Sequence, residues 1–193
     1  MHSFYLSVKS VIDKFVAVGF ILLLSPLMVV ISIVLFVLYG KVLFVQKRPG
    51  FQAQPFHMYK FITMRENDSS DIDRITPFGH FLRKLSLDEV PQLFNIIKGE
   101  MSFIGPRPFL KEYLPLYSDS HARRHSVMPG ITGLAQVTGK NNVVWSEKLD
   151  LDAYYVDHLS LGMDLKIIVL TIAYFIKGCP GCYPANKFSG YHS

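Results

Sequence analysis

The chain has 193 residues, half of them hydrophobic, and a formal net charge of +5, which fits one domain of ordinary size with a membrane-associated part. No basic stripe interleaved with aromatic residues and no zinc-finger pattern occurs, so we expect no nucleic-acid partner. The positive charge instead suits an anionic membrane leaflet and anionic substrates. Two cysteines cannot form a disulfide framework, so a reducing cytoplasm is the expected compartment.

An uncharged run, FVAVGFILLLSPLMVVISIVLFVLYG, extends from Phe15 to Gly40. Its 26 residues exceed the roughly 20 that cross a bilayer as a helix. The run is too long for a cleavable signal peptide, and no small-residue cleavage site follows it. Pro26 follows Ser25 inside the run, and a helix-interior proline predicts a kink because it removes one backbone hydrogen bond. The Ser25 hydroxyl is available to bond locally to the freed carbonyl.

Cations lie on both sides of this run, at Lys9, Lys14, Lys41, Lys47 and Arg48. Positive residues mark the cytoplasmic side of a membrane segment, and here both flanks carry them. Two arrangements are therefore open. Hydropathy alone favours a single spanning helix with a proline kink. A re-entrant helix that breaks at Ser25-Pro26 would keep both flanks cytoplasmic.

The segments after the run alternate between strand and helix patterns. VLFVQ (42–46) and FHMYKFITM (56–64) are β-rich and predict a hairpin with a longer loop. MPGITGLAQVTGK (128–140) indicates a loop with a short strand. A helix is expected around SEKLDLDAYYVDHLS (146–160), and another over 161–178. The uncharged core of the last helix is too short to span a bilayer, so we expect it to be buried or interfacial.

The charged centre of the chain is RKLSLDEVPQLFN, at positions 83–95. If Ser86 caps the helix, Ser86 and Glu89 form a capping box, but Pro91 then lies past the tolerant first turn. If Asp88 caps it, Pro91 falls at the third helical position, whose N–H is unpaired anyway. We therefore expect Asp88 as the N-cap. In both cases the carboxylates lie at the positive end of a helix, which keeps them ionised and attracts phosphate.

The carboxylates Asp88 and Glu89 are neighbours, and neighbours on a helix point about 100° apart, so they do not form a protease-type dyad. They address two different partners at one helix mouth. GPRP (105–108) presents Arg107 from a stiff turn between two prolines, and arginine binds phosphate bidentately. The alternative is structural, with a capping aspartate, a solvated glutamate and a solvated arginine on a rigid turn.

Four stretches together resemble the bacterial sugar transferase family, the small monotopic polyprenyl-phosphate phosphoglycosyl transferases. They are KFITM, RKLSLDEVPQLFNIIKGEMSFIGPRP, PGITGLAQV and KLDLDAYYVDHLSLGMDLKII, and the resemblance runs from about Val8 to about Lys177. It implies an α+β, mostly helical fold. Residues 1–40 would form an N-terminal re-entrant membrane helix broken at Ser25 and Pro26. Residues 41–193 would form a small cytoplasmic, membrane-associated catalytic domain with a short β-hairpin and amphipathic interfacial helices, the whole acting as a single functional unit.

The resemblance also implies an activity. Such enzymes transfer a sugar 1-phosphate from a UDP-sugar to polyprenyl (undecaprenyl) phosphate and release UMP, the first membrane step of bacterial glycoconjugate assembly. The mechanism is ping-pong, through a covalent aspartyl-phosphosugar intermediate. Asp88 corresponds to the catalytic nucleophile, and Glu89 is its catalytic partner. Mg²⁺ is the implied cofactor and would be held at the same two carboxylates.

The substrate-binding residues carried over by the resemblance are Lys60, Arg83, Arg107 and Asp152. The implied location is the inner leaflet of the bacterial cytoplasmic membrane, with the catalytic domain on the cytoplasmic face. Expected partners are the UDP-sugar donor, the polyprenyl phosphate acceptor and downstream glycosyltransferases. The alternative to an enzyme is a catalytically idle membrane scaffold that docks glycosyltransferases. Acetamido sugars and plain hexoses stay equal alternatives for the donor.

This sequence departs from the family pattern at three places. Lys9-Ser10 stands where many members carry Lys-Arg, and Ile62 stands where a polar or basic residue is common. The motif CPGC, from Cys179 to Cys182, belongs to no family motif. A redox pair or half a zinc site would need a preceding strand or a second Cys/His pair, so we expect a tail turn there.

Overall fold

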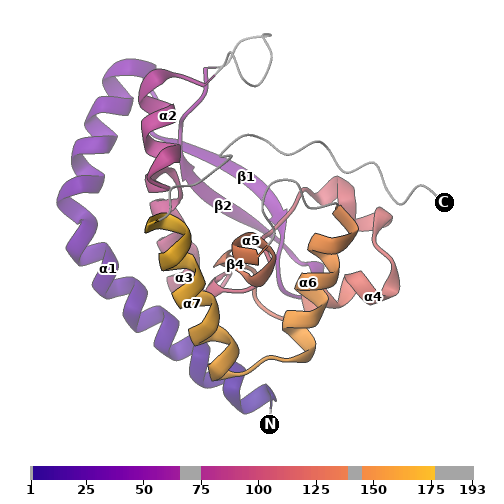
Figure 1. The fold of residues 1–193 in the computed structure, drawn as a ribbon. Coiled ribbons are helices and arrows are strands. Elements are labelled where there is room, and N and C mark those ends of the chain that lie inside the picture. Colours follow the sequence, from indigo (N-terminus) through magenta and orange to yellow (C-terminus); the bar gives the residue numbers. More distant parts are fainter. Residues whose placement is uncertain (1, 66–74, 139–144, 177–193) are drawn as a thin grey trace.

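The computed structural model describes residues 2–65, 75–138 and 145–176 of the chain (Figure 1). Within these ranges it is mostly helical, as predicted, with two small two-stranded sheets. The α-helices are α1 His2–Tyr39, α2 Pro77–Lys84, α3 Leu93–Lys98, α4 Asp119–Ala122, α5 Leu134–Thr138, α6 Trp145–Asp157 and α7 Leu161–Ile176. The 3-10 helices are η1 Phe51–Ala53, η2 Leu87–Gln92, η3 Lys111–Leu116 and η4 Arg123–Ser126. The CPGC motif lies outside the described residues.

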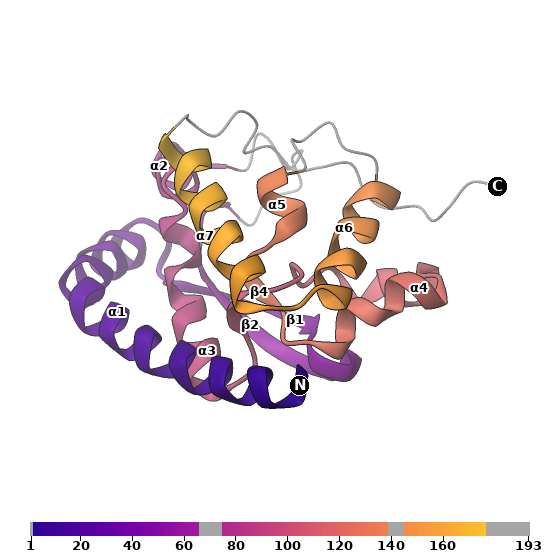
Figure 2. The same ribbon diagram turned by 60° about the horizontal axis from the view of Figure 1, so that its bottom comes forward.

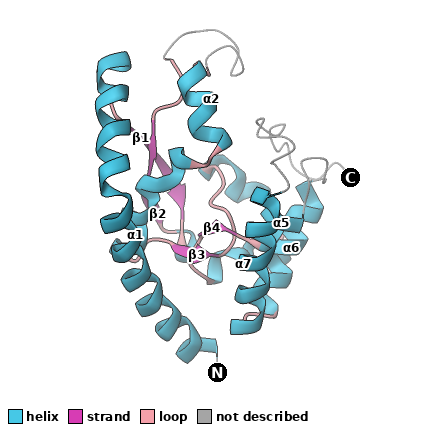
Figure 3. Cartoon of the chain, turned by 60° about the vertical axis from the view of Figure 1, so that its left-hand side comes forward, coloured by secondary structure: helices cyan, strands magenta, loops and turns pink. Residues whose placement is uncertain are grey.

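Helix α1 is continuous over 38 residues and contains Pro26. The Ser25 hydroxyl donates to the carbonyl of Leu22 at 2.9 Å, which is the carbonyl that a proline at position 26 leaves without its helical partner. In Figures 1 and 3 the two halves of α1 run in different directions and follow the body of the protein. The helix is long and apolar enough to cross a membrane. The predicted break is therefore seen as a bend in an unbroken helix.

Both ends of α1 are attached to the same body. Near its start, the Tyr5 hydroxyl and the Lys9 ammonium donate to Asp164 Oδ2 of α7, at 2.7 and 2.6 Å. Near its end, the Tyr39 hydroxyl donates to Thr76 Oγ1 at 2.6 Å. A straight spanning helix would carry one end across the bilayer and away from a body attached to the other end. Lys9, which the sequence placed among the flanking membrane cations, is paired inside the protein instead.

The predicted hairpin is confirmed. Strand β1 (Leu43–Pro49) pairs antiparallel with β2 (Pro55–Phe61), and η1 fills the turn between them. The register sets Phe44 opposite Lys60 and Arg48 opposite Phe56. Asn95 of α3 fixes the hairpin to the helix, because its side chain accepts from the amide of Tyr59 and donates to the carbonyl of His57.

A second, parallel pair joins β3 (Ser102–Ile104) to β4 (Gly130–Thr132). The sequence indicated a short strand near β4 but not its partner. Gly105 and Gly130 permit the pairing, because a Cβ on Gly130 would lie 2.1 Å from the Gly105 nitrogen. This contact brings the GPRP turn, which follows β3, against the PGITG segment.

Helix α1 supplies one wall of the core. In Figure 3 the strands lie between α1 and the group formed by α5, α6 and α7, and Figure 2 shows those three helices together above α1. Three of the four buried clusters contain α1 side chains: Ala17, Ile21 and Leu24 in the first, Tyr5 and Leu6 in the second, and Met28, Ile31, Leu35 and Tyr39 in the third. Helix α1 thus packs as part of the same body as the residues that follow.

Large apolar side chains remain exposed on the outer side of α1 and on other helices. On α7 only Asp164 and Ile167 are buried, while Leu165, Val169 and Ile172 are each more than half exposed. Soluble monomers rarely leave so much apolar surface uncovered. The pattern is consistent with membrane association, and the interfacial role of α7 stays a prediction.

Candidate active site

A carboxylate clamped by two cations forms the centre of the site. Glu89 Oε1 accepts from Lys60 Nζ at 2.6 Å and from Arg107 Nη2 at 2.7 Å. Lys60 comes from β2, Glu89 from η2, and Arg107 from the GPRP turn after β3. Burial alone would raise the pKa of Glu89, but Arg107 and Lys60 hold that pKa far below its ordinary value. Glu89 is therefore ionised and holds the side chains of Lys60 and Arg107 together.

Asp88, the adjacent carboxylate, is in a different state. It is 8% exposed, and no side-chain hydrogen bond or ion pair joins it to any residue that the structure describes. Burial and the neighbouring Glu89 raise its pKa, while Lys60, Arg83 and Arg107 act in the opposite direction. Asp88 is thus a buried carboxyl group without a side-chain partner, and its pKa is raised overall despite the nearby charges of Lys60, Arg83 and Arg107.

The local backbone corrects one prediction about this segment. The 3-10 helix η2 begins at Leu87, with Ser86 preceding it in the left-handed conformation at φ 54° and without a side-chain cap bond. Asp88 is therefore not the N-cap. Pro91 is tolerated at the fifth position because the segment is a short 3-10 turn leading into α3 rather than the interior of an α-helix. Of the two carboxylates only Glu89 has side-chain partners, Lys60 and Arg107, and Asp88 has none among the described residues.

The side chain of Arg83 is oriented by a hydrogen bond to Thr63. Its Nε donates to Thr63 Oγ1 at 2.8 Å, and Thr63 is 5% exposed. Helix α2 approaches this residue closely because Gly79 has no side chain, and a Cβ there would lie 2.1 Å from the Thr63 carbonyl oxygen. The hydrogen bond orients the guanidinium near Asp88, where its charge partly offsets the burial and the Glu89 charge that raise the pKa of that carboxyl.

The GPRP turn is fixed by a buried ion pair. Arg124 Nη2 donates to the carbonyl oxygen of Arg107 at 2.5 Å and lies 2.8 Å from Asp152 Oδ2. Arg124 and Asp152 are both 2% exposed. The guanidinium of Arg124 also stacks on the ring of Phe109, with 4.2 Å from its central carbon to the ring centre. Asp152 is therefore connected to the site indirectly: it pairs with Arg124, and Arg124 bonds to the backbone carbonyl of Arg107.

The structure brings together most of the site residues that the sequence predicted. Lys60, Asp88, Glu89 and Arg107 are in one cluster, and Arg83 lies close enough to act on Asp88. Asp152 lies behind the cluster. The sequence analysis missed Thr63 and Arg124. Thr63 lies within the KFITM motif, so its spacing from Lys60 was an available signal, whereas nothing in the HARRHS stretch (121–126) distinguishes Arg124 from Arg123.

Asp88 and Glu89 are the candidate ligands of a magnesium ion. No group of three or more His, Cys, Asp or Glu side chains suited to a metal occurs within residues 2–65, 75–138 and 145–176. Mg²⁺ is commonly held by one or two carboxylates with substrate phosphates completing its shell. Asp88 is unpaired, and both bonds to Glu89 use Oε1 rather than Oε2. The donor set fits a metal that arrives with a phosphorylated substrate.

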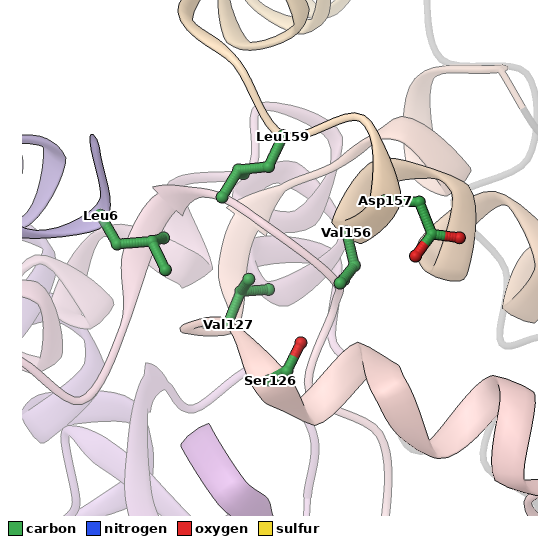
Figure 4. A pocket seen from close by; sticks show the side chains of 6 residues that line it. All are labelled: Leu6, Ser126, Val127, Val156, Asp157 and Leu159. Atoms are coloured by element: carbon green, nitrogen blue, oxygen red, sulfur yellow. The ribbon is translucent and has the colours of Figure 1, made fainter. Parts of the chain in front are cut away.

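A hollow of about 360 Å³ lies elsewhere, between the start of α1, the end of α6 and the segment after η4 (Figure 4). Its lining is mostly apolar, from Leu6, Val127, Val156 and Leu159, with Ser126 and Asp157 as the polar members. Among the described residues that line it there is no lysine or arginine. A phosphorylated donor is therefore better matched by the charged cluster than by this hollow.

Comparison with known proteins gives a consistent family. The family model described as bacterial sugar transferase matches residues 4–178. The uncharacterized sugar transferase EpsL of Bacillus subtilis (strain 168) is 52% identical over 137 residues, covering 68% of each chain. The exopolysaccharide production protein ExoY of Sinorhizobium fredii is 37% identical over 188 residues, covering 85% of this chain and 83% of that protein. The UDP-glucose:undecaprenyl-phosphate glucose-1-phosphate transferase of Xanthomonas campestris pv. campestris is 37% identical over 187 residues, covering 88% of this chain and 39% of that longer protein.

Proposed function

Because this chain belongs to the bacterial sugar transferase family of phosphoglycosyl transferases, we propose that it transfers a sugar 1-phosphate from a UDP-sugar to polyprenyl phosphate. The observation that carries the proposal is the unpaired carboxylate of Asp88, buried beside Lys60, Arg83 and Arg107. An unpaired carboxylate among cations is suited to attack phosphorus, whereas a structural carboxylate would be paired with one of them.

The reaction has two half-steps. In the first, an oxygen of Asp88 forms a bond to the sugar-linked phosphorus, and the bond from that phosphorus to the bridging oxygen breaks, so UMP leaves with the bridging oxygen. In the second, a phosphate oxygen of polyprenyl phosphate attacks the same phosphorus. The aspartyl–phosphate bond then breaks, which regenerates the Asp88 carboxylate and forms polyprenyl-diphosphate-sugar. The water-soluble donor product departs before the lipid enters, so one small site serves both.

The cations address the main barrier to this chemistry. A carboxylate that approaches a diphosphate brings like charges together, and two unit charges about 4 Å apart repel by about 4 kcal/mol at an effective dielectric of about 20. That energy corresponds to about three orders of magnitude in rate. Arg83 and Arg107 are held in place by Thr63 and Glu89, so their charges are oriented before the substrate binds.

Asp88 and Glu89 are the residues that would hold Mg²⁺, which when bound supplies further neutralisation of phosphate charge and assists the departing nucleotide. The chain's own contribution is to keep Glu89 ionised through Lys60 and Arg107. Glu89 thereby positions Lys60 and Arg107. Both of these cations bond to its Oε1, and neither bonds to its Oε2.

The membrane arrangement forms part of the proposal. Tyr5 and Lys9 near one end of α1, and Tyr39 near the other, bond to the same body. That attachment supports a re-entrant helix over a spanning one. The positive residues on both flanks of the apolar run, such as Lys14 and Lys41, support a catalytic site on the cytoplasmic face of the inner membrane. An acceptor phosphate at the lipid surface and a soluble donor then reach Asp88 from opposite sides of one interface.

The test is transfer of label from a panel of labelled UDP-sugars to polyprenyl phosphate by the purified full chain. Wild type is expected to label the lipid with at least one donor and, without acceptor, to label the protein. Asp88→Asn should abolish both labels. Asp150→Asn, which removes a carboxylate whose side chain is 68% exposed, should retain both. Full transfer by Asp88→Asn would place the nucleophile elsewhere, and a folded wild type that labels no lipid with any donor would favour a scaffold.

A further inference from the structure

Arg48 lies on the face of the hairpin that carries Lys60. Cross-strand partners share a face of a sheet, and side chains alternate between faces along a strand. The register pairs Arg48 with Phe56, Gln46 with Met58 and Phe44 with Lys60, so Arg48, Gln46 and Lys60 lie on one side. Strand β1 packs against η3, which begins four residues after Arg107. Arg48 is thus directed toward the region of the cation cluster.

The hydrogen bonds of Arg48 are incomplete. Its Nη2 donates to Gln46 Oε1 at 2.7 Å, but its Nε is buried without a hydrogen-bond partner. No carboxylate in the described part of the chain lies within ion-pair distance of it. By contrast, Lys60 and Arg107 are paired with Glu89, and Arg124 with Asp152. Arg83 also has no carboxylate partner among the described residues, but its Nε bonds to Thr63, whereas the Nε of Arg48 is buried without a hydrogen-bond partner.

This position is energetically unfavourable in the protein without substrate. Burial and the charge of Arg107 lower the pKa of Arg48 to about 10, while Tyr113, Glu112 and Tyr117 act in the opposite direction. The guanidinium therefore remains charged at neutral pH. A partly buried charge without a counter-ion costs free energy that an incoming anion would recover.

The charge balance indicates what that anion is. The cations Lys60, Arg83, Arg107 and Arg48 lie near the carboxylates Asp88 and Glu89, and the charge of Glu112 also acts on Arg48. The cations outnumber the carboxylates, so the group keeps a net positive charge. A phosphorylated substrate, such as a sugar nucleotide, carries the opposite charge, and the planar fork of arginine suits phosphate oxygens.

We propose that Arg48 is a further phosphate-binding residue of this site, contacting a phosphate group of the donor nucleotide or of the polyprenyl acceptor. The identity of the ligand rests on the proposed function. The residue's role is to bind substrate, and no bond forms or breaks at it. The two possible sources of the phosphate are distinguished by which Michaelis constant changes.

The experiment compares Arg48→Gln with Lys47→Gln in the full chain. Lys47 is the adjacent strand residue, is exposed and lies on the opposite face, so its change removes the same charge without touching the site. Arg48→Gln is expected to raise one KM by about 10- to 100-fold, and Lys47→Gln by less than about 2-fold. A rise for the UDP-sugar assigns the nucleotide phosphates, and a rise for polyprenyl phosphate assigns the acceptor. Arg48→Lys keeps the charge without the fork and should give a smaller rise in the same KM.

A binding measurement separates this proposal from the proposed function. Calorimetry with UMP, inorganic pyrophosphate and a short-chain polyprenyl phosphate probes the site without turnover. If wild type transfers no sugar phosphate but one of these ligands binds more weakly to Arg48→Gln, the function fails and the assignment of Arg48 stands. The variant measured is Arg48→Gln if it folds, and Arg48→Lys if Arg48→Gln does not fold. If that variant shows wild-type KM values and wild-type affinity for all three ligands, the assignment is overturned.

Discussion

The Nζ of Lys9 lies 2.6 Å from Oδ2 of Asp164, joining residues 155 positions apart. The side chains of this ion pair are 10% and 6% exposed. Asp164 also accepts from the hydroxyls of Tyr5 and Tyr155, both at 2.7 Å. One carboxylate thus holds the start of α1 against α6 and α7.

Asp164→Asn should destabilise the protein strongly. The variant leaves Lys9 buried without its counter-charge, and breaking a buried pair in this way costs about 3 kcal/mol or more. The measurement is chemical unfolding of the full chain in detergent. Asp157→Asn is the matched control, because its pair with Arg123 is about half exposed, at 51% and 41%, and should cost less than about 1 kcal/mol. Equal free energies of unfolding for the two variants would contradict the conclusion that Asp164 holds the start of α1 in place.

Thr63→Val should reduce activity while preserving the shape of the residue. It removes the hydroxyl that accepts from Arg83 Nε, so the guanidinium loses its fixed orientation near Asp88. We expect kcat/KM to fall by about 10-fold, measured by transfer of label to polyprenyl phosphate. Thr63→Ser keeps the hydroxyl and should recover most of the activity. A Thr63→Val enzyme as active as wild type would show that Arg83 needs no such support.

Asp152→Asn tests whether this residue contacts substrate or positions Arg107. Asp152 is paired with Arg124, which bonds to the Arg107 carbonyl, so the two side chains should act as a unit. We expect Asp152→Asn, Arg124→Gln and the double variant to lower kcat/KM by similar factors, with a coupling energy of about 0.5–3 kcal/mol. Additive losses, with a KM increase confined to Asp152→Asn, would instead indicate a direct substrate contact.

His125 should make stability depend on pH. Burial and the charge of Arg124 lower its pKa to about 4, against a partly opposing hydrogen bond to the Gly50 carbonyl. Between pH of about 6.5 and about 4 the unfolded chain therefore binds a proton that the folded protein does not, so the free energy of unfolding falls as pH decreases through this window. His125→Gln should flatten this part of the curve, measured by urea unfolding at several pH values.

The control for this prediction is His158→Gln. His158 is exposed, and its loss should leave the slope between pH of about 6.5 and about 4 as in wild type. A His125→Gln curve that is parallel to wild type throughout the window would show that another group causes the acid sensitivity.

The parts of the fold with local signals were predictable from the sequence. The hairpin followed from two β-rich runs, the apolar helix from its length, and α6 and α7 from their helical patterns. The resemblance of their motifs to a known family predicted Lys60, Glu89 and Arg107 as site residues, and the structure places the three in contact. The Ser25 hydroxyl also bonds locally, as expected.

The remaining features depend on long-range contacts. Capping rules favoured Asp88 as the N-cap, but tertiary packing selects a 3-10 turn that buries Asp88 and directs Glu89 to Lys60. The pairing of Lys9 with Asp164 has no local signature, since either residue alone is typical of a solvated helix surface. The counter-charge missing from Arg48 becomes visible only when every neighbouring carboxylate has been placed.

The attachment of α1 at both ends has a consequence for biosynthesis. During translation Lys9 is made 155 residues before Asp164, so the polar contact that holds the start of α1 forms only once α7 has been made. Chains released before α7 is complete would therefore carry an α1 whose first turns are not held by Asp164.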